Sequence, residues 1–426
     1  MMETRVTGSE ILLESLKREK VEVVFGLPGG AVLPLYDALY SAGIRHLLVR
    51  HEQAAGFAAD GYARVTGKPG VCLVTSGPGA TNLITALTSA LMDSIPIVAL
   101  TGQVPQSLIG KDGFQEADTI GISLACTKQS FQIRSAGEIP EVIHRAFQTA
   151  VSGRPGPVLV DLPKSVLMEK DTPRYASGNG RSPGAVRRRE WSEEDIERAA
   201  AMILESRRAV FYAGGGTIHS EAWPELTELA ELSQIPVTTT LMGLGAFPSC
   251  HPLSLGMLGM HGSYSTNMAV CESDLLIAVG ARFDDRVTGR LKDFATQARK
   301  IQIDVDPSEA GKNVRVDMAL VGDAKEALRA ITATLRRRTG AAATRDRRAW
   351  LDRIDAWRKE HPLAYDKSSD SVKPQFVIET ISRHVDEDAI IAVDVGQHQM
   401  WAAQFYDFYQ PRTWLSSSGL GSMGYG

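Results

Sequence analysis

Short apolar runs alternate with amphipathic stretches over the first 170 residues. Strand-length apolar runs occupy residues 21–25, 46–49, 71–75, 95–101 and 158–161, and the helical stretches between them include 53–65 and 80–92. Strands that alternate with helices form βαβ units, in which helices cover both faces of a parallel sheet. Because such sheets bind ligands beyond the carboxyl ends of their strands, we expect chemistry in the loops that follow these runs.

The same alternation returns twice further along the chain. A Pro- and Gly-rich linker is expected at 171–190, and the block after it contains a helix at 192–205 with Ser192 as its N-cap. Strands are expected there at 209–212, 275–279 and 300–304. A third block starts near Trp350 and contains a helix at 375–381, a strand at 389–393 and a Gly-rich end.

This pattern predicts an α/β fold of three doubly wound parallel-sheet domains. The expected domains are 1–170, 191–345 and 346–426, with the linker at 171–190. The third block has one strand and about two helices, which cannot cover a sheet on both faces. We therefore expect the third domain to be incomplete and the chain to be truncated at its C-terminus.

Composition excludes several classes of protein. Hydrophobic residues make up 43% of the chain and charged residues 23%, which is ordinary for a globular protein and excludes disorder as the main state. The net charge of −4 argues against nucleic acid as the main partner and gives no general attraction to anionic membranes. No apolar run approaches the ~18–20 residues that span a bilayer, and no signal peptide is visible, so we expect a cytoplasmic protein.

The four cysteines do not form a recognisable framework. Cys72, Cys126, Cys250 and Cys271 include no C-x-x-C pair. They fit buried thiols in a reducing compartment better than a set of disulfides or a zinc site.

Three loops after the first strands carry glycine or acidic residues. The missing Cβ at Gly29 and Gly30 (residues 26–31, GLPGGA) lets a ligand approach the backbone closely. Residues 51–55 (HEQAA) begin like the zinc-protease pattern H-E-x-x-H, but the final Ala excludes it and leaves Glu52 as a carboxylate suited to proton exchange if buried. Residues 75–82 (TSGPGATN) open a helix whose N–H groups suit an anion or a polar ring edge. Taken singly, each loop also fits an ordinary strand-to-helix turn.

Later motifs suggest a nucleotide site of an unusual kind. Residues 419–424 match G-x-G-x-x-G, but residues 214–219 miss the third glycine, so a Rossmann dehydrogenase is disfavoured. Arg282 and Arg286 follow a strand and either hold a pyrophosphate or form a surface ion-pair cluster. Residues 304–306 (DVD) either meet a ribose hydroxyl or form a turn before Pro307.

Taken together, these motifs resemble the large catalytic subunit of acetolactate (acetohydroxyacid) synthase, a thiamine-diphosphate-dependent enzyme family. The matching blocks are residues 24–31, 50–53, 75–82, 101–105, 114–116, 152–158, 280–286, 393–399 and 418–426. They occur in the family's order and cover essentially the whole chain. The resemblance implies a pyrimidine-binding N-terminal domain, a central FAD-binding domain and the start of a diphosphate-binding domain.

The activity that the resemblance implies is decarboxylation of pyruvate on thiamine diphosphate followed by transfer of the hydroxyethyl unit. The acceptor is a second pyruvate, giving 2-acetolactate, or 2-oxobutyrate, giving 2-aceto-2-hydroxybutyrate. This is the first common step of valine, leucine and isoleucine biosynthesis. Glu52 matches the family's glutamate that hydrogen-bonds the aminopyrimidine ring, and Phe114, Gln115 and Lys164 match residues near the reacting carbon and the channel mouth. The other positions that match thiamine diphosphate contacts are Gly30, Pro78, Asn82, Val395, Gly396, Gln397, His398, Gly421 and Met423.

The family also holds FAD, which has a structural role and is not reduced in the main cycle. The positions that match its FAD contacts are Arg154, Gly214, Gly215, Gly216, Thr240, Leu241, Met242, Met260, His261, Gly280, Ala281, Arg282, Asp284, Arg286, Val287, Asp304, Val305 and Asp323.

The metal site and the partners also follow from the resemblance. The family's Mg2+ ligands match no residue of this chain and are expected beyond Gly426, so very low activity is expected of this chain alone. A homodimer or dimer of dimers with a small regulatory subunit is implied, and no nucleic-acid or membrane partner. Two alternatives stay open: a sibling thiamine enzyme (pyruvate oxidase or decarboxylase), and a non-catalytic chain that serves as an FAD-holding scaffold or dimer partner.

Overall fold

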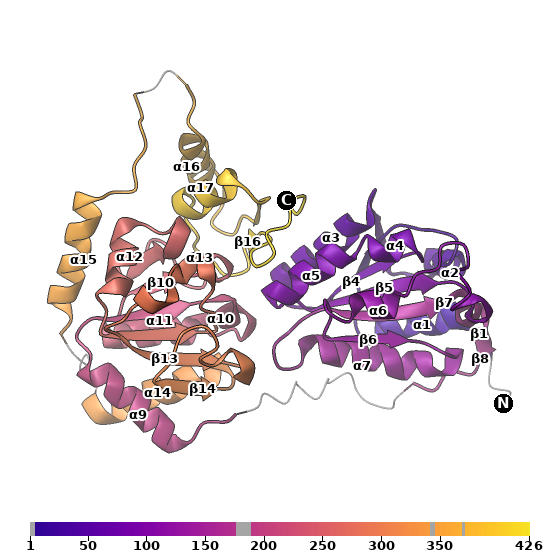
Figure 1. Ribbon diagram of the computed structural model, residues 1–426, viewed down its shortest axis with the longest axis horizontal. Coiled ribbons are helices and arrows are strands. Elements are labelled where there is room, and N and C mark those ends of the chain that lie inside the picture. Colours follow the sequence, from indigo (N-terminus) through magenta and orange to yellow (C-terminus); the bar gives the residue numbers. More distant parts are fainter. Residues whose placement is uncertain (1–4, 176–188, 341–345, 369–370) are drawn as a thin grey trace. The chain divides into compact units, whose positions relative to one another are not determined.

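The computed structural model describes residues 5–175, 189–340, 346–368 and 371–426. Contacts divide the chain into an N-terminal unit (Met1–Val186 with Ser417–Tyr425) and a central unit (Arg187–Ser416 with Gly426). Each unit is built on its own six-stranded sheet (Figure 1). Residues 176–188 of the expected linker and residues 341–345, at the end of the expected central domain, lie outside the described residues.

The sheet of the N-terminal unit is entirely parallel, with the strand order β3-β2-β4-β5-β7-β6. Its strands are β2 (Val23–Gly26), β3 (Arg45–Leu48), β4 (Gly70–Val74), β5 (Ile97–Gln103), β6 (Gln129–Gln132) and β7 (Val158–Pro163). The chain runs from β2 outward to β3 and then returns to the other side of β2 with β4. Between β2 and β4 the strand order therefore reverses, and open parallel sheets bind ligands at such a switch point.

Helices cover both faces of this sheet (Figure 1). On one face, Ile11, Leu35 and Ile143 of α1 (Gly8–Arg18), α2 (Leu33–Ala42) and α7 (Ile139–Val151) share a core with the strands. On the other face lie α3 (Glu52–Thr66) and α5 (Ile84–Asp93), which pack tightly together. The shorter elements are β1 (Val6–Thr7), α4 (Pro78–Thr81), η1 (Gln106–Leu108), α6 (Thr119–Ser123), η2 (Ala136–Glu138), α8 (Lys164–Met168) and β8 (Lys170–Asp171), of which β1 and β8 pair antiparallel.

The sheet of the central unit is also parallel, in the order β11-β10-β9-β12-β13-β14. Its strands are β9 (Ala209–Ala213), β10 (Val237–Thr239), β11 (Ser254–Met257), β12 (Leu275–Val279), β13 (Arg299–Asp304) and β14 (Met318–Val321). The first three strands run to one side and the last three to the other. The switch point of this sheet therefore lies between β9 and β12.

Two helical layers enclose the central sheet. On one face, α9 (Glu193–Glu205), α11 (Trp223–Ser233) and α14 (Ala324–Thr339) form a core with the strands, and on the other face α12 (Tyr264–Cys271) and α15 (Arg348–Glu360) do so. The shorter elements are α10 (Gly215–His219), η3 (Leu241–Gly243), η4 (Gly259–His261), α13 (Asp285–Thr288), η5 (Leu291–Asp293) and η6 (Pro307–Glu309).

The third block is short and joins the central unit. It contains α16 (Pro374–His384), β15 (Ile391–Ala392), α17 (Gln397–Phe405) and β16 (Trp414–Leu415), and its two strands pair in parallel. Residues of α17 and β16 share a small apolar cluster with Leu244 and Met257 of the central unit. The expected α/β architecture is confirmed, with two complete parallel sheets and a short third part.

Local signals were accurate where they depended on neighbouring residues. Ser192 is the N-cap of α9, and with Asp195 it forms a capping box. The single helix expected at 80–92 is wrong, because α4 ends at Thr81 and α5 begins at Ile84. The expectation of buried thiols holds for Cys72 and Cys126 but not for Cys250 and Cys271, which are exposed.

Candidate active site and cofactor-binding site

Three loops meet at the switch point of the N-terminal sheet, beyond the carboxyl ends of β2, β3 and β4. Thr75 lies between them, and its Oγ1 accepts the N–H of Ala31 at 3.3 Å. A Cβ at Gly29 would lie 2.6 Å from the Thr75 side chain, and one at Gly79 would lie 2.7 Å from it. Only glycine fits at both positions, so the Thr75 side chain packs directly against the backbone of Gly29 and Gly79. Gly30 and Pro78, two of the expected thiamine diphosphate positions, lie in these loops.

Glu52 is the first residue of α3 and is half-buried. Its Oε2 accepts a hydrogen bond from Nδ2 of Asn82 at 2.9 Å, and His51 caps the helix by accepting the N–H of Gln53 at 3.1 Å. Asn82 follows α4 directly, at the point where the helix expected at 80–92 is interrupted. The carboxylate is therefore held against the 75–82 loop, where it can accept a hydrogen bond from an amino-substituted ring.

Gln115 packs over the same loop. Its φ is 61°, in the left-handed region, and a Cβ at Gly77 would lie 2.7 Å from its carbonyl oxygen. The neighbouring Phe114 is 89% exposed. Lys164 begins α8 directly after β7, at the same carboxyl edge of the sheet, and is half-buried.

The Gly-rich segment Ser417–Tyr425, which carries Gly421 and Met423, is anchored in the N-terminal unit. Asp93 accepts the N–H groups of Ser418 at 2.9 Å and Gly419 at 2.7 Å. Gly421 has a φ of 70°, and the Met423 side chain is exposed. The structure thus places these two expected cofactor positions in the same unit as Glu52.

A buried charged cluster underlies this anchor, and sequence reasoning missed it. Arg64 of α3 pairs with Asp60 at 2.5 Å and with Asp93 at 2.8 Å, and the Tyr425 hydroxyl donates to Asp60. Burial raises the pKa of Asp60, while the charge of Arg64 and the hydrogen bonds from Arg64 and Tyr425 act in the opposite direction. The Asp-x-x-x-Arg spacing on one face of α3 was the available signal, but it is equally typical of exposed helix pairs.

The remaining thiamine diphosphate positions lie in the central unit. Val395 and Gly396 follow β15, and Gln397 and His398 begin α17. Gly396 has a φ of 157°. These four residues form one strand-to-helix turn, which is the arrangement that presents free backbone N–H groups.

The central-unit positions expected to bind FAD share one structural feature. Five groups follow the carboxyl ends of β9, β10, β11, β12 and β14, respectively: Gly214–Gly216, Thr240–Met242, Met260–His261, Gly280–Arg282 and Asp323. Asp304 is the last residue of β13, and Val305 follows it. Asp284, Arg286 and Val287 lie a few residues further on, at α13. All six strands thus bring this set to one edge of the sheet. Arg154 lies in the N-terminal unit, where its guanidinium donates to Ser94 Oγ at 2.8 Å.

Glycines close the switch point of this sheet. A Cβ at Gly214 would lie 2.3 Å from the carbonyl oxygen of Gly280, and one at Gly216 would lie 2.6 Å from the Cα of Gly280. The backbones after β9 and β12 therefore touch where a dinucleotide-binding sheet takes its ligand.

Charged groups near this edge have shifted proton affinities. Burial raises the pKa of Asp284, whose Oδ1 accepts the N–H of Arg286 at 3.0 Å. Burial and the charge of Arg286 lower the pKa of His261. Asp306 accepts the N–H and hydroxyl of Ser308, which is the behaviour of a turn residue before Pro307.

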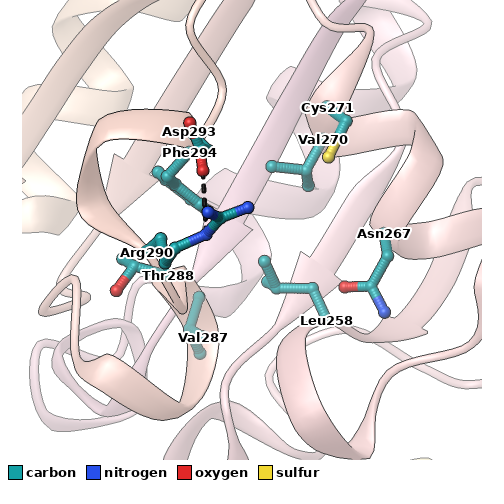
Figure 2. Close-up of a pocket in the computed structure, with 9 residues that line it drawn as sticks. All are labelled: Leu258, Asn267, Val270, Cys271, Val287, Thr288, Arg290, Asp293 and Phe294. Atoms are coloured by element: carbon teal, nitrogen blue, oxygen red, sulfur yellow. Dashed lines mark ion pairs between the residues drawn. The ribbon is translucent and has the colours of Figure 1, made fainter.

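A pocket of about 240 Å3 opens beside this edge (Figure 2). It is lined by Leu258, Asn267, Val270, Cys271, Val287, Thr288, Arg290, Asp293 and Phe294. Figure 2 shows the Arg290 guanidinium beside Asp293, to which it pairs at 3.0 Å. The volume is below the ~300–1,000 Å3 of drug-sized ligand sites, so this pocket alone is too small for a dinucleotide.

Within residues 5–175, 189–340, 346–368 and 371–426, no group of three or more His, Cys, Asp or Glu side chains could hold a metal ion. No helix in the described part of the chain is long and apolar enough to cross a membrane.

Comparisons with known families agree with this geometry. Three family descriptions match: "Thiamine pyrophosphate enzyme, N-terminal TPP binding domain" at residues 6–122, "Thiamine pyrophosphate enzyme, central domain" at 196–331 and "Thiamine pyrophosphate enzyme, C-terminal TPP binding domain" at 394–426.

The similar proteins compared here are all named as large subunits of acetolactate synthase. The chain is 50% identical to the acetolactate synthase large subunit of Corynebacterium glutamicum over 99% of its own length and 67% of that protein. It is 49% identical to the probable acetolactate synthase large subunit of Methanocaldococcus jannaschii (98% and 72% covered) and 46% identical to the acetolactate synthase isozyme 3 large subunit of Escherichia coli (99% and 74%). The chain thus spans about two thirds to three quarters of the length of these relatives, and it belongs to the acetolactate synthase large-subunit family of thiamine pyrophosphate enzymes.

Proposed function

We propose that this protein is the catalytic subunit of an acetolactate synthase. It decarboxylates pyruvate and transfers the two-carbon unit to a second pyruvate, or to 2-oxobutyrate. The observation that carries the proposal is Glu52, held by Asn82 at the glycine-lined switch point of a parallel sheet. Family membership identifies the reaction to which such a carboxylate belongs.

The residues present fit thiamine diphosphate. Glu52 would hydrogen-bond the ring nitrogen of the aminopyrimidine, accepting its N–H in the imino tautomer, and the open space at Gly30 leaves room for the ring to approach. The turn Val395–His398 would receive the diphosphate, and Gly421 and Met423 would contact the cofactor. Bound thiamine diphosphate supplies the electron sink for decarboxylation of a 2-oxo acid.

FAD is the second cofactor of the proposal. The positions that follow all six strands of the central sheet support it, as does the backbone contact between Gly214 and Gly280 at the switch point. Arg282 and Arg286 would hold its pyrophosphate by charge-assisted hydrogen bonds. In this proposal FAD has a structural role.

Magnesium is the third expected cofactor. Within the described residues no group of three or more His, Cys, Asp or Glu side chains could hold a metal ion, and no residue is assigned to magnesium. The proposal further includes the three-domain division, a dimer or dimer of dimers, a small regulatory subunit and a cytoplasmic location.

The test is acetolactate formation by the protein expressed from its own gene, supplied with pyruvate, thiamine diphosphate, FAD and Mg2+. We expect acetolactate from the wild-type protein and a loss of about 100-fold or more in kcat for Glu52→Gln. Glu141→Gln, an exposed change on α7, is the matched control and should leave kcat unchanged. Free acetaldehyde as the only product would indicate a decarboxylase instead. Reduction of the flavin by pyruvate would indicate an oxidase. The absence of any turnover would indicate a non-catalytic scaffold.

A further inference from the structure

The loop that carries Phe114 and Gln115 has a conformation that its sequence alone does not favour. Gln115 has a φ of 61°, in the left-handed region that costs a residue with a Cβ about 1 kcal/mol or more. Phe114 projects into solvent beside it. Such a backbone persists only where surrounding contacts hold it.

The Glu116 side chain supplies part of those contacts. The carboxylate of Glu116 turns back into its own loop, where Oε1 accepts the N–H of Gly110 and Oε2 accepts the N–H of Gly113 at 2.9 Å. The N–H of Glu116 in turn donates to the carbonyl of Gly113 at 2.9 Å. The backbone amides of Gly110 and Gly113 lower the pKa of Glu116, and those of Lys111 and Asp112 lower it further. The carboxyl group is therefore a charged acceptor at neutral pH.

The loop is also fixed on its outer sides. On one side, the Gln115 backbone lies against Gly77, where an added Cβ would lie 2.7 Å from the Gln115 oxygen and 2.9 Å from its Cα. On the other side, the carbonyl of Ala117 accepts Nε2 of Gln103, at the end of β5, at 2.9 Å. Gln115 therefore lies between two fixed elements: the 75–82 loop, which contacts Glu52, and the end of β5.

We propose that Glu116 is a positioning residue for carboligation: it holds Phe114 and Gln115 against the Gly77–Gly79 loop and thereby sets which 2-oxo acid is accepted as second substrate. The inference rests on the proposed function. Glu116 itself contacts backbone amides and acts only through its two neighbours.

Glu116→Gln is the sharpest variant, because the side chain keeps its size and loses one acceptor. An amide offers one oxygen, so its NH2 group must face the N–H of either Gly110 or Gly113. We expect kcat/KM to fall about 10-fold or more, and the ratio of 2-aceto-2-hydroxybutyrate to acetolactate, formed from mixed substrates, to change at least threefold. The loss should appear mainly in the KM of the second 2-oxo acid, while binding of FAD and thiamine diphosphate stays as in the wild type.

Glu138→Gln is the matched control. Glu138 also accepts a backbone N–H, that of Arg134 at 3.2 Å, but it follows the edge strand β6, three strands away from β4. It should leave the product ratio unchanged. Hydrogen exchange of the amides of residues 110–113 gives a second readout, and it should be faster in Glu116→Gln only.

Each outcome decides something. Faster exchange with an unchanged product ratio and KM would show that Glu116 has a purely structural role and would overturn the proposal, and unchanged exchange would overturn it at its first step. If the wild type forms no acetolactate, the proposed function fails and takes the carboligation role with it, while the exchange result still reports whether Glu116 holds the loop.

Discussion

Asp161 is a buried carboxylate whose protonation should control the pH dependence of the N-terminal unit's stability. It lies in β7, where its Oδ1 accepts the Thr101 hydroxyl at 2.9 Å and its Oδ2 accepts the side-chain amides of Gln103 and Gln132 at 3.1 Å each. Burial raises its pKa to about 6 from 3.8, since the three hydrogen bonds only partly offset the cost of removing the charge from water; the neighbouring Asp118 adds to the rise.

The sign of the effect follows from this raised value. The folded state binds the proton more tightly than the unfolded chain, so the stabilisation is complete below pH 3.8 and is lost as the pH rises through about 6. A shift of about two pKa units corresponds to about 3 kcal/mol at pH 7 and above. Asp161→Asn should remove this dependence. Its oxygen can accept both glutamine amides, and its NH2 group can donate to the Thr101 hydroxyl oxygen.

Hydrogen exchange of the β5 and β7 amides measures this effect locally. Wild type and Asp161→Asn are compared at each pH between 4 and 7.5, so that intrinsic exchange rates cancel. The opening free energy of the wild type relative to the variant should fall by about 2–3 kcal/mol over that range. Ser41→Ala, at an exposed serine of α2, changes no titratable group and should give a difference that does not vary with pH. A constant difference for Asp161→Asn as well would refute the reasoning.

Two further substitutions, one in each unit, test buried contacts. Arg347 is 2% exposed and donates to the carbonyls of Ser233 (2.5 Å), Ile203 (2.6 Å) and Ser206 (3.2 Å). Arg347→Met should therefore lower the free energy of unfolding of the central unit by about 3 kcal/mol. Urea unfolding followed by tryptophan fluorescence measures this, and a loss below ~0.5 kcal/mol would contradict it. Gly56→Ala would place a Cβ 2.4 Å from that of Ala86, so it should destabilise the α3–α5 contact by about 1–3 kcal/mol and weaken thiamine diphosphate binding, whereas adding Ala86→Gly should restore both.

The sequence pattern predicted the continuous apolar strands and the edge strand β3, but it missed β6, β10, β11 and β14. Residues 71–75 and 275–279 are continuous apolar runs, and β4 and β12 lie there, buried throughout. Strand β6 (QSFQ) lies at the edge of its sheet and carries polar side chains, so no apolar run announces it. The pattern also missed the interruption between α4 and α5, and it carried no sign of the hydrogen bond from Asn82 to Glu52, 30 residues away.

The candidate site was predictable in its glycines and not in its supports. Glycines after strands mark close approaches to the main chain: the Thr75 side chain lies against Gly29 and Gly79, and the Gly280 carbonyl lies against Gly214. The hydrogen bonds that hold the loops in place cross the fold: Thr101 reaches Asp161 over 60 positions, and Gln103 reaches it over 58. Local patterns carry no record of such pairs, since each residue alone reads as an ordinary polar side chain.

Glu116 and Asp161 lie at opposite ends of one chain of contacts, yet their effects should separate. Gln103 links them, since its Nε2 donates both to Asp161 and to the carbonyl of Ala117. Its Oε1 also accepts the N–H of Val104 at 2.8 Å, which fixes the orientation of its amide whether or not Asp161 is protonated. Asp161→Asn should therefore remove the pH dependence of stability and leave the product ratio unchanged. Glu116→Gln should change the product ratio and leave the pH dependence of stability as in the wild type. A shift of the product ratio in Asp161→Asn would mean that Gln103 transmits the state of the core carboxylate to the Gln115 loop.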